Sequence, residues 1–389
     1  MKISVATRLN GIGEYYFSQK LREIEALNKG GAAVINLGIG SPDMAPDVNV
    51  IETLQAESSK ATVHAYQNYK GVVALREAMA AWYKKWYNVV LDPATEILPL
   101  IGSKEGIMHI CMTYLNEGDE ALIPNPGYPT YSSAVKLSGG KPVYYKLLAE
   151  TDWQPDFEAL ENSDLSRVKL MWVNYPHMPT GQPASKALFE KLVAFGKKHS
   201  ILICHDNPYS FILNETPMSL LSVEGAKEVA IELNSLSKSH NMAGWRVGML
   251  CGAKERIEEV LRFKSNMDSG MFLPLQIAAT KALSLDEEWH ASLNSHYRER
   301  REKVFSLLDL LGCIYSKEQV GLFVWAKIPS GYKDGYALSD DILYKSNVFI
   351  TPGGIFGSEG DGYIRVSLCS TTENLEAAIN RIKTRLVKQ

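Results

Sequence analysis

The feature that most constrains the fold is an alternation between short apolar runs and amphipathic stretches from about residue 97 to residue 253. The apolar runs have the length and composition of buried strands and cover residues 121–124, 142–147, 169–176, 201–206, 229–237 and 247–252. Between two of them, the stretch 185–199 repeats its apolar residues at helical spacing. This alternation predicts an α/β fold with a mostly parallel, doubly wound sheet. Such sheets bind ligands beyond the carboxyl ends of their strands, so the residues that follow each run are the first candidates for chemistry.

The pattern changes after residue 275 and predicts a second, smaller α/β domain. Residues 276–311 form one long helical segment, which we expect to join the two domains. It is followed by two strand-like runs, at 321–329 and 362–369, and by a terminal helix at 373–388. We therefore expect three parts: an N-terminal arm with part of the small domain at 1–45, a large domain at 46–285 and a small C-terminal domain at 286–389.

Charge and cysteine usage exclude several classes of protein. The formal net charge is −3, so the chain lacks the positive field that attracts proteins to nucleic acids or anionic membranes. The five cysteines are scattered through the sequence, a pattern that is not a zinc-site spacing and that favours a reducing compartment. No apolar run is long enough for a signal sequence or a membrane span. We expect a cytoplasmic protein with no metal site and no nucleic-acid or membrane partner.

Several strand ends carry residues suited to binding a ligand. Asp206 ends an apolar strand, and a buried carboxylate there needs a cation or strong donors. Small residues at 102–106 open a helix and could cradle a phosphate, although an ordinary helix N-cap at Ser103 is the favoured interpretation of this stretch taken alone. Tyr128 could lie flat on a planar ring, or it could be a packed loop tyrosine.

A lysine and an arginine eight positions apart follow the strand-like run at 229–237. Lys238 would serve as a nucleophile only as an unprotonated amine, which burial and nearby positive charge favour. Arg246 could return to the same site and hold a phosphate through two parallel hydrogen bonds. Taken singly, each residue is more often a surface charge. The pair indicates a phosphorylated ligand beside a reactive amine.

The stretch SLSKSHNMAGWRVG at residues 235–248 resembles the lysine signature of the class I/II aminotransferases. These are pyridoxal-phosphate enzymes of fold type I, the aspartate aminotransferase superfamily. The resemblance extends over nearly the whole chain, through the segments at 37–43, 64–66, 71–77 and 363–367 and the strand ends described above. It implies a large domain with a mostly parallel doubly wound sheet, a smaller α/β domain, and pyridoxal 5'-phosphate as cofactor.

The resemblance also implies roles for individual residues. Lys238 matches the Schiff-base lysine that moves a proton, Asp206 the partner of the pyridine nitrogen, and Tyr209 the donor to the ring hydroxyl. The ring that stacks on the pyridine matches Tyr128, and the phosphate-cradle positions match Ser103, Lys104, Ser235 and Arg246. The resemblance places Arg365 on the substrate carboxylate with Gly40 beside it. It places Tyr66 at the phosphate of a neighbouring subunit, which implies a homodimer with shared sites.

One turn departs from the family pattern. The family usually has Asn-Pro-Thr-Gly, with the asparagine bonded to the ring hydroxyl, whereas this chain has Met178-Pro179-Thr180-Gly181. Methionine cannot donate a hydrogen bond. Asn174, four positions earlier, is the candidate to replace the lost cofactor contact.

The resemblance predicts transfer of an amino group from an L-amino acid to a 2-oxo acid such as 2-oxoglutarate. We expect a neutral, aromatic or sulfur-containing donor. Tyr15, Tyr16 and residues 271–273 are candidate lining of its pocket, although core packing explains them equally well. The alternative is a carbon–sulfur beta-lyase of the same fold, some of which carry a Pro-His before this turn. A DNA-binding regulator lacks support because the chain has no basic extension, and a nicotinamide dehydrogenase because it has no G-x-G-x-x-G turn after a strand.

Overall fold

The computed structural model describes residues 3–14 and 16–386, and its centre is a seven-stranded sheet. The strand order is β2-β8-β7-β6-β5-β3-β4. Only β8 is antiparallel to its neighbours. The strands are β2 (Ile97–Leu100), β3 (Glu120–Asn125), β4 (Lys141–Lys146), β5 (Val168–Val173), β6 (Leu202–Asp206), β7 (Ala230–Ser235) and β8 (Gly248–Gly252). The predicted mostly parallel α/β sheet is therefore confirmed.

The central strands are apolar because helices cover both faces of the sheet. Within β5, Leu170 and Trp172 belong to one core cluster, whereas Met171 and Val173 belong to another, as the two-residue period of a strand requires. The first cluster is closed by α4 (Ser103–Tyr114), α5 (Pro129–Leu137) and α10 (Lys254–Lys264). The second is closed by α3 (Val73–Tyr87), α7 (Lys186–His199) and α11 (Leu273–Leu283), and α2 (Val48–Ser58) packs on α11. Shorter helices are α6 (Phe157–Glu161) and α8 (Ala226–Val229).

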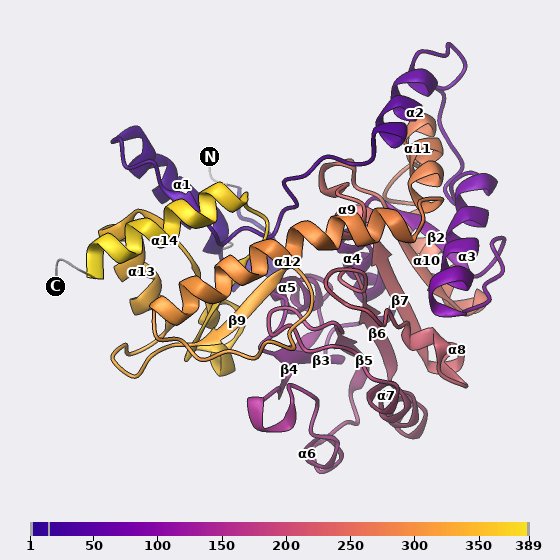
Figure 1. Ribbon diagram of the computed structural model, residues 1–389. Coiled ribbons are helices and arrows are strands. Elements are labelled where there is room, and N and C mark those ends of the chain that lie inside the picture. The colour runs from indigo at the N-terminus through magenta and orange to yellow at the C-terminus, as the bar shows by residue number, and fades with distance from the viewer. Residues whose placement is uncertain (1–2, 15, 387–389) are drawn as a thin grey trace.

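A second, smaller body combines segments from the first and the last part of the described chain (Figure 1). Its three-stranded antiparallel sheet has the order β11-β12-β9, and a separate pair joins β1 to β10 in parallel. The strands are β1 (Ile35–Asn36), β9 (Phe323–Lys327), β10 (Val348–Phe349), β11 (Thr351–Pro352) and β12 (Tyr363–Ser367). The helices are α1 (Tyr16–Lys29), α13 (Gly335–Ser346) and α14 (Thr372–Leu386). The exact domain limits stay a prediction.

The expected single helix at 276–311 is wrong in one respect, because the structure contains two helices there. The first, α11, ends at Leu283, and α12 (Glu287–Leu310) begins after Asp286. The Asp286 side chain accepts hydrogen bonds from the backbone N–H groups of Glu288 and Trp289, which caps the new helix. Figure 1 shows that α12, and not α11, is the helix that runs from the large body to the smaller one. Among the described residues, no helix is long and apolar enough to cross a membrane.

Buried neutral histidines predict that the protein loses stability in mild acid. Burial lowers the pKa of His177 to about 3 and that of His290 to about 4. An unfolded chain binds these protons near pH 6.5, whereas the folded chain does not until the lower pKa is reached. The free energy of unfolding should therefore fall as pH drops from about 6.5 to about 4, by up to about 1.4 kcal/mol per pH unit for each histidine.

Urea unfolding of the wild type and of His290→Gln across this range checks the prediction. The variant should show a shallower pH dependence than the wild type. His296→Gln, at an exposed position of the same helix, is the matched control and should keep the wild-type slope. Equal slopes in the wild type and His290→Gln would contradict the assignment.

Candidate active site

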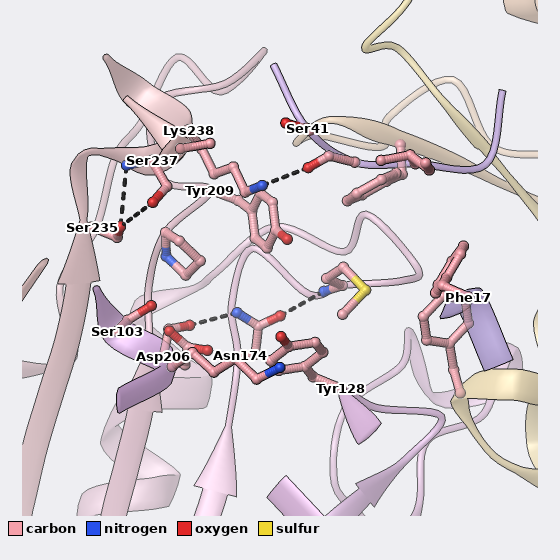
Figure 2. A pocket seen from close by; sticks show the side chains of 18 of the residues that line it. Phe17, Ser41, Ser103, Tyr128, Asn174, Asp206, Tyr209, Ser235, Ser237 and Lys238 are labelled. Atoms are coloured by element: carbon pink, nitrogen blue, oxygen red, sulfur yellow. Dashed lines mark hydrogen bonds between the residues drawn. The ribbon is translucent and has the colours of Figure 1, made fainter. Parts of the chain in front are cut away.

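A cavity of about 510 Å³ lies at the carboxyl ends of the central strands and extends to the smaller body. Its size is typical of a site for a small ligand. The cavity brings together residues that are far apart in the sequence, several of which Figure 2 shows. All but one of the predicted site residues line it: Gly40, Ser103, Lys104, Tyr128, Asn174, Asp206, Tyr209, Ser235, Lys238, Arg246 and Arg365.

Lys238 extends into this cavity from the short helix α9 (Leu236–Ser239), directly after β7. Its Nζ donates a hydrogen bond to the carbonyl oxygen of Gly40, at 2.5 Å (Figure 2). Burial lowers the pKa of Lys238 below its usual range, and Arg365 and Arg246 lower it further against an opposing effect of Cys369. An amine with a lowered pKa is more often unprotonated, which is what a nucleophile or a proton acceptor requires.

Asp206 ends β6 and is almost completely buried at the floor of the cavity. Burial raises its pKa to about 6, and the hydrogen bond from Tyr131 and the charge of His205 act in the opposite direction. Oδ2 accepts a hydrogen bond from Tyr131, at 3.0 Å. Oδ1 has no hydrogen-bond partner among the described residues. A buried acceptor without a partner is costly in a folded protein, so Oδ1 is suited to a donor supplied by a ligand.

Tyr131 is a site residue that the sequence analysis missed. Its hydroxyl holds Asp206, and its ring packs edge-on against Tyr128 with centroids 5.5 Å apart. The ring also stacks on Trp172, with ring centroids 5.0 Å apart and an angle of 9° between the ring planes. One buried tyrosine thus positions both the carboxylate and the aromatic side chain that line the cavity.

Tyr128 and Tyr209 line the cavity as predicted, and burial raises the pKa of both hydroxyls. Each phenol therefore stays protonated at neutral pH and can donate a hydrogen bond. The ring of Tyr209 packs edge-on against Phe323 of β9, with centroids 5.9 Å apart. This contact connects the end of β6 with the smaller body.

An anion cradle lies where α4 begins. Gly102 precedes the helix with a φ of +80°, and a Cβ at this position would collide with the guanidinium of Arg246. Glycine thereby allows Arg246 to lie against the free N–H groups of the helix start, which together favour an anion. Ser235 donates to Ser237 at 2.8 Å, and Arg246 donates to the same hydroxyl at 3.4 Å. Ser237, which lines the cavity, is a second residue that the sequence analysis missed.

Arg365 lies on β12 and faces the cavity from the smaller body. The guanidinium carbon lies 3.8 Å from the centroid of the Phe323 ring and 4.6 Å from that of Phe356. Its Nη2 donates to the carbonyl oxygen of Gly38, at 2.8 Å. Beside it, a Cβ at Gly40 would overlap the Phe323 ring, so only glycine fits there. The arrangement presents one fixed cation to a carboxylate.

The unusual turn is braced by Asn174. The side-chain carbonyl of Asn174 accepts from the N–H of Met178 at 2.7 Å, and its amide nitrogen donates to the backbone oxygen of Asp206 at 2.5 Å (Figure 2). Asn174 thus uses one bond to hold the turn and the other to tie the turn to the end of β6. Met178 places its sulfur 3.3 Å from Nη1 of Arg365. Whether Asn174 also contacts the cofactor stays a prediction.

The predicted site residue outside this lining is Tyr66, which is 91% exposed on the surface. It was expected at the site of a neighbouring subunit, so its role stays a prediction. Tyr15 lies outside the described residues. Tyr16 packs on Tyr336 and Met271 lies in the core of the large body, so for these two residues the structure favours the alternative of core packing over the pocket. Met178, which the sequence analysis singled out for another reason, is part of the apolar lining, and the rest comes from residues that were not singled out: Phe17, Leu21, Ile39, Phe323 and Phe356.

The donor set fits pyridoxal phosphate. Asp206 Oδ1 is a buried acceptor for a protonated ring nitrogen, and the cradle at Gly102 and Arg246 is suited to a phosphate. The amine of Lys238 lies in the same cavity. Each of the three chemical ends of this cofactor therefore has a partner of matching charge or reactivity.

Comparisons with known proteins agree with this site. The family model described as aminotransferase class I and II matches residues 32–382. An LL-diaminopimelate aminotransferase of Moorella thermoacetica is 39% identical over 385 residues, 98% of each chain. The apo-BacF structure from Bacillus subtilis has a TM-score of 0.94 at 37% identity and covers 99% of this chain and 98% of its own. An aromatic aminotransferase from Pyrococcus horikoshii has a TM-score of 0.86 at 30% identity, and the match covers 92% of this chain and 96% of that one. The chain belongs to the class I and II aminotransferases, the pyridoxal-phosphate enzymes of fold type I.

Proposed function

We propose that this aminotransferase takes its amino group from an L-amino acid with a neutral side chain, aromatic or sulfur-containing, and passes it to a 2-oxo acid such as 2-oxoglutarate. The observation that carries the proposal is the lining of the cavity near Arg365, where the side chains of Phe17, Leu21 and Phe356 are apolar. Asp206 is the one acidic side chain among the described lining residues. A neutral side chain needs no ionic partner, and an apolar wall favours it.

The site residues have distinct roles in this proposal. Lys238 would hold the cofactor through Nζ, and once the amino group of the substrate has displaced it, the freed amine would accept the α-proton, which its lowered pKa favours. Asp206 keeps the ring nitrogen protonated, and Tyr209 donates to the ring hydroxyl. When bound, pyridoxal phosphate supplies an electron-withdrawing ring that delocalises the electron pair left by the departing α-proton. Arg365 binds the α-carboxylate and thereby aims the α-hydrogen at Lys238.

The remaining cofactor contacts belong to the walls of the cavity. Tyr128 stacks on the ring, and Asn174 remains the candidate for an added contact near the ring hydroxyl. The phosphate is held by the cradle residues: Ser103, Lys104, Ser235, Ser237 and Arg246. Gly40 gives the substrate carboxylate room beside Arg365.

LL-diaminopimelate is a second candidate donor, which the names of curated relatives favour. Such a molecule carries an ammonium and a carboxylate at its distal end. Burying these charges requires ionic partners. The single acid of the described cavity lining, Asp206, is already matched to the cofactor, so a distal ammonium would need a carboxylate from outside this cavity.

A panel of amino donors with 2-oxoglutarate distinguishes these possibilities, and we expect kcat/KM to be highest for a neutral aromatic or sulfur-containing amino acid. Glutamate formation is measured for each donor. A strong preference for diaminopimelate or aspartate would overturn the proposed donor class. Release of pyruvate and ammonia from a sulfur-containing donor, without glutamate, would instead identify the beta-lyase reaction.

We further propose a cytoplasmic homodimer in which Tyr66 reaches the phosphate of the neighbouring site. The proposal is supported by the exposed aromatic residues on this face, where Tyr69 and Phe272 accompany Tyr66 and His64 stacks on Phe272. The free cysteines are consistent with a reducing compartment. Sedimentation should show a dimer. Tyr66→Phe should weaken cofactor binding without dissociating the dimer. A fully active monomer would contradict the shared site.

A further inference from the structure

Lys20 is buried although neither the cofactor site nor the proposed chemistry uses it. This α1 residue is 8% exposed, and lysine is rarely buried without an ionic partner. Its Nζ lies 2.8 Å from Oε2 of Glu23 in the same helix and 3.2 Å from Oδ1 of Asp340 in α13. The ammonium therefore ties α1 to α13.

The same helix forms part of the cavity wall. Phe17, Leu21 and Ile24 recur at i, i+4 and i+7, so they lie along one face of α1. Ile24 packs with Leu343 and Phe349 in the core of the smaller body. Phe17 and Leu21 line the cavity. The position of this part of the wall is thus determined by how α1 is held on the smaller body.

The wall lies where the side chain of a bound amino acid would extend. The Phe17 ring centroid is 5.8 Å from the guanidinium carbon of Arg365, the proposed carboxylate partner. Figure 2 shows Phe17 across the cavity from Ser103 and Ser235, which belong to the phosphate cradle. An amino acid bound through Arg365 has the cofactor on one side and α1 on the other.

We propose that Phe17 and Leu21 form the wall that selects the substrate side chain, and that the Lys20–Asp340 ion pair is the latch that holds this wall over the cavity. This inference rests on the proposed preference for a neutral side chain. Lys20 touches neither substrate nor cofactor, so it is a positioning residue. Without its ammonium, the carboxylates of Glu23 and Asp340 lose the cation between them, and their repulsion favours separation of α1 from α13. The hydrogen bond from Tyr344 of α13 to Glu23 remains, so the helices loosen but stay in contact.

Binding of two unreactive acids to the holoenzyme tests the proposal. Propionate and 3-phenylpropionate share a carboxylate for Arg365, but only the second reaches the wall. The measured ratio is the Kd for propionate divided by the Kd for 3-phenylpropionate. We expect this ratio to fall roughly tenfold in Phe17→Ala and in Leu21→Ala, as for loss of an apolar contact in a pocket. It should fall about threefold in Lys20→Met, which keeps the chain length and removes the charge. The Kd for propionate should change much less than that for 3-phenylpropionate in all three variants, because propionate does not reach the wall.

Two further variants isolate the latch. Lys29→Met removes a charge from the same helix, where Lys29 is exposed and pairs only within α1 to Glu25 among the described residues, so the ratio should stay at the wild-type value. Asp340→Asn should lower the ratio as Lys20→Met does. The two changes together should lower it no further, because both break one ion pair.

Hydrogen exchange of the peptide 16–29 supplies a measurement that does not depend on ligands. Exchange should be faster in Lys20→Met than in the wild type or in Lys29→Met. A wild-type ratio or wild-type exchange in Lys20→Met would overturn the latch, as would an equal loss of affinity for both acids. Because neither acid reacts, these outcomes do not depend on which donor is preferred. A donor panel that favours a charged amino acid overturns the proposed function instead.

Discussion

Lys238→Ala is expected to lose transamination by at least roughly 10⁴-fold, because one side chain supplies both the bond to the cofactor and the proton acceptor. Lys238 Nζ faces the cavity, is held by the carbonyl oxygen of Gly40, and has a pKa below its usual range. Among the described lining residues, the other lysine is Lys104, which lies at the phosphate cradle. Initial rates of glutamate formation measure the loss.

Two measurements separate a chemical effect from a folding defect. Equilibrium dialysis should show that Lys238→Ala still binds pyridoxal phosphate, since the cradle and Asp206 are intact. Borohydride reduction followed by peptide mapping should label residue 238 in the wild type and nothing in the variant. Lys141→Ala, at an exposed position of β4, should keep full activity. More than a trace of transamination in Lys238→Ala would remove this lysine from the mechanism.

The sequence predicts the chemistry of the site better than its packing. Asp206 ends β6 and Lys238 follows β7, and parallel strands bring their carboxyl ends to one edge. Arg246 precedes β8, which is antiparallel to β7, so the start of β8 lies at the same edge. The position of each reactive group therefore follows from the strand order. Arg365 could not be placed this way, because it lies on a strand of the smaller body. Its inclusion depended on the family resemblance.

The residues that the sequence analysis missed act through tertiary contacts. Tyr131 is an ordinary tyrosine in the first turns of α5, and only the structure shows that its hydroxyl reaches Asp206. Phe17 and Leu21 come before all the other site residues in the sequence, on a helix whose apolar face also fits a plain core position. No local pattern distinguishes such residues from ordinary core residues.

The break between α11 and α12 shows a different limit. The helical period continues across 284–286, so periodicity alone predicts one helix. The chain ends α11 at Leu283 because Asp286 can cap a new helix. An aspartate in a helical pattern has two interpretations, an exposed position or an N-cap, and the tertiary structure decides between them.

Asp206→Asn should keep cofactor binding measurable but lower the rate by roughly 10²- to 10³-fold, the usual range for removing one preorganised electrostatic group. Asparagine has the same shape as aspartate and keeps an oxygen in the site, but it carries no charge. A neutral amide cannot hold the proton on the ring nitrogen, so the ring withdraws electrons less strongly. The rate of glutamate formation and the Kd for pyridoxal phosphate together separate this effect from lost binding.

Tyr131→Phe provides the graded comparison, because it removes the donor to Oδ2 and leaves the charge of Asp206 in place. The hydrogen bond from Tyr131 lowers the pKa of Asp206, so its loss should raise that pKa. The carboxylate is the active form, and the acid limb of the kcat/KM profile should therefore move to higher pH in the variant. At neutral pH the rate should fall only several-fold, as for one hydrogen bond worth about 1 kcal/mol. A near-normal rate in Asp206→Asn, or a larger loss in Tyr131→Phe than in Asp206→Asn, would mean that the charge of Asp206 does not contribute to the reaction.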